Sequence, residues 1–161
     1  MAKEHGYNVT VQWTGNQGSG TSAYNAYSRD HIIEANDKPP IEGSSDPAFR
    51  GTFSRYNPED LLVASLSACH MLWYLHLCAE AGITVISYAD DAVGVMEEVE
   101  GGSGRFTLVT LRPKVMVEAG AEVGRAKTLH HEAARKCFIA NSVNFPVALE
   151  PVLEVGPVVS L

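Results

Sequence analysis

The sequence is poor in cysteine and in positive charge, and both shortages limit what the protein can be. It has three cysteines in 161 residues, an odd and sparse number that argues against a framework of structural disulfides. Its 12 lysines and arginines are outnumbered by 19 acidic residues, and the formal net charge is −7. No basic run is present. A phosphate backbone is bound by clustered Lys and Arg, so we do not expect nucleic acid as a partner.

Long uninterrupted apolar segments are also missing. The first residues, MAKEHGYNVTVQW, contain no apolar h-region, so no secretory signal is expected. The longest apolar stretch, residues 61–81, is interrupted by serine, histidine and glutamate. It predicts a buried helix and not a membrane span. Reduced thiols are then the default, and we expect a cytoplasmic protein in which any disulfide is transient.

What remains is an ordinary globular composition. Hydrophobic residues make up 45% of the chain and charged residues 19%, which is typical of a folded protein. A chain of 161 residues can bury a core without metal or disulfide cross-links. We therefore expect a single domain over residues 1–161.

The first third of the chain predicts short strands followed by a long loop. Residues 7–13 alternate apolar and polar side chains, as in a strand. Residues 21–28 and 31–34 are expected to form a hairpin whose turn lies near residues 29–30. Residues 36–57 are rich in Asn, Asp, Pro, Gly and Ser. They predict a loop of about twenty residues, a length that is usually functional or mobile.

Two helices and three longer strands complete the expected fold. Asn57 suits the N-cap of the first helix, Pro58 suits its first turn, and Gly82 suits the position after its end. The expected helices cover residues 58–81 and 121–138, and the expected strands cover residues 83–99, 106–117 and 147–155. The order βββαββαβ favours an α+β domain with an antiparallel sheet.

The helical spacing separates the three cysteines. Cys69 shares a helix face with Leu66 and Trp73, so this pattern alone favours a buried packing residue on the core face. Cys78 follows nine residues later, about 180° around the helix, and is also expected to be a packing residue. Cys137 is expected near the C-terminal end of the second helix, where the helix dipole does not stabilise a thiolate.

Two segments carry a family resemblance: NPEDLLVASLSAC at residues 57–69 and CFIANSVNFPV at residues 137–147. With the Arg-Asp pair at residues 29–30, they resemble the family of osmotically induced protein C and organic hydroperoxide resistance protein. In that family the reactive cysteine follows the glutamate of an Asn-Pro-Glu helix start by ten residues. Cys69 follows Glu59 by the same interval.

The resemblance has two departures. Phe138 follows the second cysteine, where the organic hydroperoxide branch often has Pro. Ala134 lies three residues before that cysteine, where many members have His. The branch, and with it the preferred peroxide, therefore stays open.

The resemblance implies both a fold and an activity. The fold would be an intertwined α+β homodimer with antiparallel sheets, two central helices and active sites between the chains. The activity would be thiol-dependent reduction of organic hydroperoxides or hydrogen peroxide, without cofactor or metal. Cys69 would form a sulfenic acid and then a disulfide with Cys137. An external dithiol, of lipoyl type for some members, would reduce that disulfide.

This chemistry requires a cation, because the thiolate is the nucleophile and burial raises the pKa of a thiol. The resemblance assigns this role to Arg29, whose guanidinium stays protonated. Glu59 is the candidate partner for that charge, although any helix favours an acid in its first turn. Arg50 and Arg55, in the long loop, are rival cations.

Two other functions are possible from the sequence. The segment at residues 131–135, HEAAR, begins like a zinc-protease helix but lacks the second histidine, which disfavours a metal site. The family fold also implies an apolar pocket near the thiols, with Trp73, Phe138 and Phe145 as candidate lining residues. Such a pocket would suit a non-catalytic module that binds a fatty-acyl-like ligand.

Overall fold

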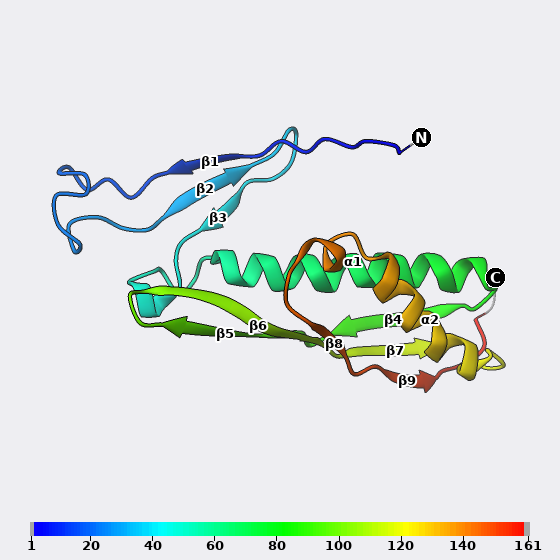
Figure 1. Cartoon of the computed structure of the whole chain (residues 1–161). Coiled ribbons are helices and arrows are strands. Elements are labelled where there is room, and N and C mark those ends of the chain that lie inside the picture. The colour runs from blue at the N-terminus through cyan, green and yellow to red at the C-terminus, as the bar shows by residue number, and fades with distance from the viewer. Residues whose placement is uncertain (1, 160–161) are drawn as a thin grey trace. The chain divides into compact units, whose positions relative to one another are not determined.

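The computed structural model describes residues 2–159, which form two compact units (Figure 1). The first unit ends at Leu61 and the second begins at Leu62. This boundary lies within the longest helix, α1, which runs without a break over Pro58–Glu80.

The first unit contains a small antiparallel sheet with strand order β1-β2-β3. Its strands are β1 (Thr10–Trp13), β2 (His31–Glu34) and β3 (Ile41–Gly43). The hairpin expected over residues 21–28 and 31–34 is wrong, because β2 pairs with β1 and β3. Residues 18–26 form turns and bends, which the Asn16 side chain helps to start by accepting the amides of Gly18 and Gly20.

The segment predicted as a structureless loop, residues 36–57, is partly regular. It contains β3 and a short 3₁₀ helix, η1 (Pro47–Phe49), whose first turn is capped by the Asp46 carboxylate at 2.7 Å from the Ala48 amide. The buried Ser44 hydroxyl accepts the amide of Thr52 at 3.0 Å. Side-chain bonds to the backbone therefore fix a segment whose composition signals only turns.

The start and the end of α1 agree with the sequence prediction. The Asn57 side chain accepts the Asp60 amide at 2.7 Å, and the Asp60 carboxylate accepts the Asn57 amide at 3.3 Å. This reciprocal pair is a capping box. Gly82 has φ +70°, the left-handed conformation that commonly ends a helix.

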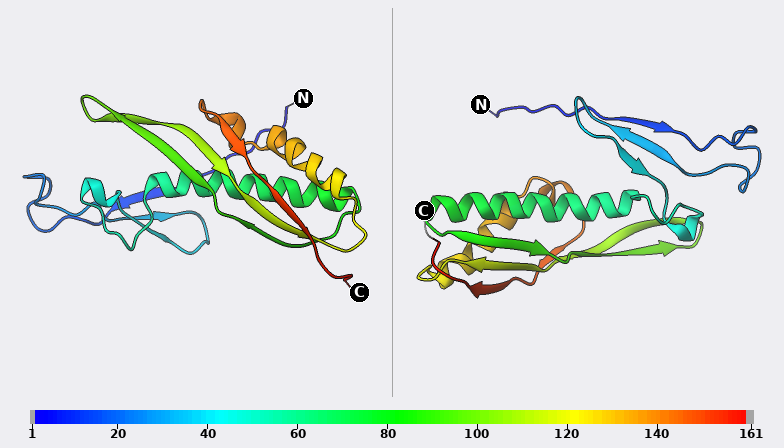
Figure 2. Two further views of the ribbon diagram at one scale, coloured as in Figure 1. Left: turned by 90° about the horizontal axis from the view of Figure 1, so that it is seen from below. Right: turned by 180° about the vertical axis from the view of Figure 1, so that it is seen from behind.

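The second unit contains two three-stranded sheets beside two helices (Figures 1 and 2). Its further elements are β4 (Val85–Asp90), β5 (Val93–Val99), β6 (Ser103–Leu111), β7 (Pro113–Val117), α2 (Val123–Lys136), the 3₁₀ turn η2 (Ala140–Ser142), β8 (Val147–Leu149) and β9 (Val152–Val155). The sheet orders are β4-β7-β9 and β5-β6-β8.

Each of the three long strands expected in this unit is divided into two. The chain leaves one sheet and enters the other after Asp90, after Leu111 and after Leu149. Pro113 begins β7, a position where the missing amide is tolerated. The sheets are also not purely antiparallel. β8 and β9 add parallel to β6 and β7, while the β4–β7 and β5–β6 pairs are antiparallel as expected.

Helices α1 and α2 pack together with β7 around the larger core of the second unit. Its buried residues are Tyr74, Leu77, Cys78, Ile83, Val115, Val117, Ala126, Leu129 and Ala133. Cys78 is therefore a packing residue, as predicted. The expectation from helical spacing that Cys69 is a buried packing residue is wrong. The buried stripe passes through Leu66, His70 and Tyr74, whereas Cys69 remains half-buried.

By length and composition alone, α1 is apolar enough to cross a membrane. The core helix of a soluble protein passes the same test, and the buried side of α1 contributes to two clusters that also include strand residues. Several of its other apolar side chains are exposed, including Leu72. The absence of a membrane partner therefore stays a prediction.

Candidate active site

The side chains of Cys69 and Cys137 lie close enough together that Cys69 helps to raise the pKa of the Cys137 thiol. Cys69 projects from the middle of α1, and Cys137 directly follows the last residue of α2. Both thiols are free. The two side chains that the resemblance assigned to one redox pair, 68 positions apart in the sequence, are therefore neighbours in the structure.

The sequence predicted Cys137 inside the second helix. The structure instead places it just beyond the helix, in an extended conformation. The chain then enters η2, and the Ala140 amide approaches the Cys137 Sγ at 3.4 Å. Burial raises the pKa of the Cys137 thiol to about 11, and the contact with Cys69 adds to this effect. The amides of Ala140 and Ile139 act in the opposite direction but do not outweigh burial. Cys137 is thus a protonated thiol at neutral pH.

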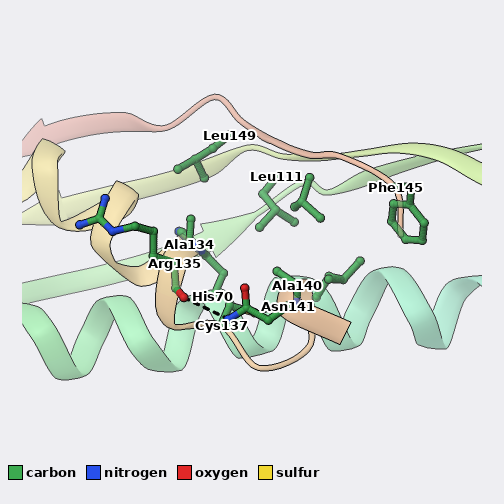
Figure 3. Close-up of a pocket in the computed structure, with 11 residues that line it drawn as sticks. His70, Leu111, Ala134, Arg135, Cys137, Ala140, Asn141, Phe145 and Leu149 are labelled. Atoms are coloured by element: carbon green, nitrogen blue, oxygen red, sulfur yellow. Dashed lines mark hydrogen bonds between the residues drawn. The ribbon is translucent and has the colours of Figure 1, made fainter. Parts of the chain in front are cut away.

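Cys137 lines a cavity of about 320 Å³ in the second unit (Figure 3). The walls are mostly apolar and come from α1, α2, η2, β6, β8 and the segment before β8. The lining residues are Leu66, His70, Leu111, Ala134, Arg135, Cys137, Ala140, Asn141, Phe145, Val147 and Leu149. Phe145 lines it as expected. Trp73 instead contacts Phe138 edge to face, with ring centroids 5.7 Å apart.

A buried histidine pair lies beside this cavity. The Nε2 of His70 and the Nδ1 of His130 are 3.1 Å apart, and both residues are at most 1% exposed. Burial lowers the pKa of His70 to about 4, against the opposing charge of Asp90. Burial, followed by the neighbouring His70 and His131, lowers the pKa of His130 to about 3. Both rings are therefore neutral at pH 7.

The histidine pair predicts a loss of stability in mild acid. A histidine of the unfolded chain takes up a proton near pH 6.5, whereas the folded pair does so only near pH 4 and below. Protonation thus favours unfolding, and stability that is complete above pH 6.5 falls as the pH drops toward 4. Each histidine is expected to cost about 2 kcal/mol between pH 7.5 and pH 5.

Urea unfolding at pH 7.5, 6.5 and 5 measures this loss. The His130→Asn variant keeps a polar atom facing His70 but cannot titrate, so its stability should fall about 2 kcal/mol less than that of wild type over the same range. The control is His76→Gln, at an exposed position of α1. Equal losses in wild type and His130→Asn would contradict the prediction.

Arg29 lies in the first unit, where its guanidinium is held by carbonyls and aromatic rings. It donates to the carbonyl oxygens of Tyr27 and Tyr24 at 2.7 and 2.8 Å. It also lies over both rings, at 4.1 and 4.4 Å from their centroids. Among residues 2–159, no carboxylate forms an ion pair with Arg29. Its charge is oriented but not neutralised.

The rival Arg55 is occupied by acidic neighbours. Its Nε lies 3.7 Å from Asp30, and one terminal nitrogen lies 3.4 Å from Glu42. Burial would raise the pKa of the Asp30 carboxyl, but hydrogen bonds from Thr52 and other hydroxyls, together with the charge of Arg55, hold it below its usual value. Arg55 thus joins the strands and the loop of the first unit.

Arg50, the other rival, ends η1 with φ +65° and is exposed. Its guanidinium is 6.0 Å from the centroid of the Tyr24 ring, which also stacks on Arg29.

Glu59 is half-buried in the first turn of α1. Within the described part of the first unit it forms no ion pair with Arg29 or with any other cation. The structure thus brings together Cys69 and Cys137, but it does not join Glu59 to Arg29 within one chain.

His70, His130 and Asp90 were not predicted from the sequence as part of this site. The Asp90 carboxylate accepts the Ser67 hydroxyl at 2.5 Å and the Arg112 amide at 2.6 Å. His70 directly follows Cys69, which was a usable signal, but His130 and Asp90 approach it only through packing. Among residues 2–159, no three His, Cys, Asp or Glu side chains gather in a way that would hold a metal ion.

The fold and the thiol pair define an α+β protein with two neighbouring cysteines beside an apolar cavity, and the comparisons with known proteins agree with this class. The OsmC-like protein family matches residues 51–151. An OsmC-like protein of unknown function from Vibrio cholerae is 32% identical, with 92% of this chain and 100% of that chain covered and a TM-score of 0.83. This chain belongs to the OsmC-like family.

More distant solved structures share the fold. An organic hydroperoxide resistance protein from Elizabethkingia anophelis is 16% identical, with 97% of this chain and 100% of that chain covered and a TM-score of 0.70. One from Legionella pneumophila is 15% identical, with coverage of 96% and 100% and a TM-score of 0.68. The comparison with curated proteins gave no match.

Proposed function

We propose that this protein reduces hydroperoxides, with Cys69 as the attacking thiolate and Cys137 as the resolving thiol. The observation that carries the proposal is the proximity of Cys69 to Cys137, which lines the apolar cavity. Cys69 is the more accessible of the two, and Cys137 is 1% exposed. This difference in exposure suits a first thiol that reacts with the peroxide and a second thiol that reacts only with the sulfenic acid formed on the first.

The reaction has three balanced steps. The Cys69 thiolate attacks one peroxide oxygen, the O–O bond breaks, and the alkoxide leaves as an alcohol after taking a proton. The Cys137 sulfur then attacks the sulfenic sulfur, and the hydroxyl leaves as water with the thiol's proton. An external dithiol, of lipoyl type, reduces the Cys69–Cys137 disulfide by exchange and becomes a disulfide itself.

Arg29 is our candidate for the cation that favours the Cys69 thiolate. Its planar guanidinium is already oriented by two carbonyls and two rings, and it has no carboxylate partner within the described chain. Arg55 is paired with Asp30 and Glu42, which leaves less of its charge for a thiolate.

We further propose that the working protein is a homodimer in the cytoplasm. The support for the dimer is an apolar surface on the single chain beside the cysteines, where Leu72 and Phe138 are 63% and 66% exposed. A second copy that covers this surface would also offer its Glu59 and Arg29 to the site.

Peptide mapping after a single oxidation tests the proposed function. The reduced protein is treated with one equivalent of tert-butyl hydroperoxide, remaining thiols are alkylated after denaturation, and the linked peptides are identified by mass spectrometry. We expect Cys69 joined to Cys137, Cys78 alkylated, and continued peroxide consumption once dihydrolipoamide is added. A disulfide that includes Cys78, or unchanged thiols, would contradict the proposal.

The apolar lining of the cavity favours one alternative, a module that binds a fatty-acyl-like ligand without chemistry. In that case the protein would bind a fluorescent fatty acid but leave peroxide unconsumed at every dithiol concentration. Hydroperoxide consumption that requires Cys69 would exclude this alternative.

A further inference from the structure

The histidine pair has no role in the three steps above, although it is buried beside the cavity that Cys137 lines. His70 and His130 face each other with ring planes 3° apart and a nitrogen–nitrogen distance of 3.1 Å. His70 also lines the cavity together with Cys137, and both residues carry labels in the close-up of that cavity (Figure 3). The bond to His130 uses the Nε2 of His70, so its Nδ1 is not engaged by that bond.

The proposed chemistry creates a proton problem at Cys137. Its thiol carries a proton at neutral pH, because burial and the contact with Cys69 raise its pKa to about 11. That proton must leave as the sulfur attacks the sulfenic acid. When the dithiol later breaks the disulfide, the departing Cys137 sulfur must regain a proton, since a thiolate in this buried position is a poor leaving group.

We propose that His70, held in place by His130, relays this proton. During disulfide formation the imidazole of His70 accepts the Cys137 proton, the S–S bond forms, the S–O bond breaks, and the proton is returned to the departing hydroxide as water. During reduction the proton from the attacking dithiol passes through His70 to Cys137. The inference rests on the proposed function and assigns a new residue to its second and third steps.

The charges around His70 suit transient transfer. Asp90 on β4 favours the imidazolium, while Arg135 and His131 are the other cationic or titratable groups of α2 near the pair. Burial dominates and keeps His70 neutral at rest. A neutral imidazole is ready to accept a proton, and the buried imidazolium releases it again quickly.

His130 is a positioning residue that holds the His70 ring from the side facing the core. Its ring stacks on Tyr74 with centroids 3.8 Å apart, and the Tyr74 hydroxyl donates to the Ala126 carbonyl at 3.2 Å. The His130 Nε2 is buried and has no hydrogen-bond partner among residues 2–159. A proton shared with His130 therefore has no onward path in the described chain and returns through His70.

The test separates the peroxide step from the resolution step. Reduced wild type and His70→Gln receive one equivalent of hydrogen peroxide between pH 6 and pH 10, and samples are quenched over time. A sulfenic-acid reagent reports the Cys69 sulfenic acid, and peptide mapping reports the disulfide. We expect sulfenic acid formation to stay within about twofold and disulfide formation to slow at least about tenfold at pH 7.

The pH profile distinguishes a relay from a structural role. The deficit of His70→Gln should shrink as the pH approaches 10, because hydroxide then removes the Cys137 proton without help in a much larger fraction of molecules than at pH 7. The control His76→Gln, at an exposed position of the same helix, should match wild type at every pH. A deficit that is constant across pH, or no deficit, would overturn the relay and leave the proposed function intact.

Two further outcomes are also decisive. If His70→Gln does not fold, His130→Asn takes its place, with a smaller deficit at pH 7 that also disappears at high pH; a pH-independent deficit there overturns the relay. If wild type forms no Cys69 sulfenic acid at all, the proposed function fails and the relay fails with it.

Discussion

Replacing Cys69 with serine is expected to abolish dithiol-dependent peroxide reduction, leaving only the rate of the dithiol and peroxide without protein. A serine hydroxyl does not ionise near neutral pH and cannot form a sulfenic acid or a disulfide, so both the first and the second step are lost. The loss should exceed about a thousandfold, as is common when the nucleophile of an enzyme is removed. The measurement is peroxide consumption with dihydrolipoamide as the reductant.

The matched control is Cys78→Ala. Cys78 lies on the same helix but is fully buried in the core formed with α2 and β7. Its removal should leave turnover within a few-fold and lower the free energy of unfolding by about 1 kcal/mol through lost packing. Full activity of Cys69→Ser, or loss of activity in Cys78→Ala with the fold intact, would show that the wrong thiol has been assigned.

Mixing two inactive proteins is expected to restore activity. If Glu59 of one chain serves Cys69 of its partner, Cys69→Ser and Glu59→Ala are each defective alone. A mixed dimer has one site with both residues intact and one site lacking both. With random subunit exchange half of the dimers are mixed, so activity should recover to about a quarter of the wild-type value.

The reason for a shared site is the geometry of α1. The helix is continuous from Pro58 to Glu80, so the ten residues between Glu59 and Cys69 advance about 15 Å along its axis. They also rotate the two side chains roughly 80° apart. A glutamate cannot span that separation, and within residues 2–159 Glu59 has no cationic partner.

The controls use subunit exchange and the single variants. Exchange is verified with two differently tagged chains before activity is measured. No recovery after proven exchange would refute the shared site. Wild-type activity of Glu59→Ala alone would remove Glu59 from the mechanism and leave it as a residue that only suits the helix start.

The parts of the fold that depend on local signals could be predicted from the sequence. Asn57 and Gly82 mark the ends of α1 because capping and left-handed conformations belong to particular residue types. The strands were harder, since residues 83–99 are strand-like on both sides of Asp90 and Asp91. The step from one sheet to the other, where the Asp90 carboxylate accepts the Arg112 amide, depends on partners far away in sequence.

The site shows the same division. The Cys69 and Cys137 pairing was expected only through family resemblance, because their helical positions alone favoured packing. The position of Cys137 beyond α2 follows from the η2 turn, whose Ala140 amide meets the sulfur. The contact of His70 with His130 joins residues 60 positions apart, and no local pattern in a single sequence reports such a pair.

The parallel addition of β8 to β6 also has a consequence for the order in which the chain is made. β8 supplies Val147 and Leu149 to the cavity wall, so a ribosome must synthesise nearly all of the described chain before that wall exists. Cys69 emerges long before Cys137, and in the interval it lacks the thiol that we propose as its resolving partner. Domains fold as units during synthesis. The nascent protein therefore passes through a stage at which an oxidised Cys69 cannot yet form a disulfide with Cys137. Encounter with peroxide at that stage would leave a chain open to irreversible oxidation.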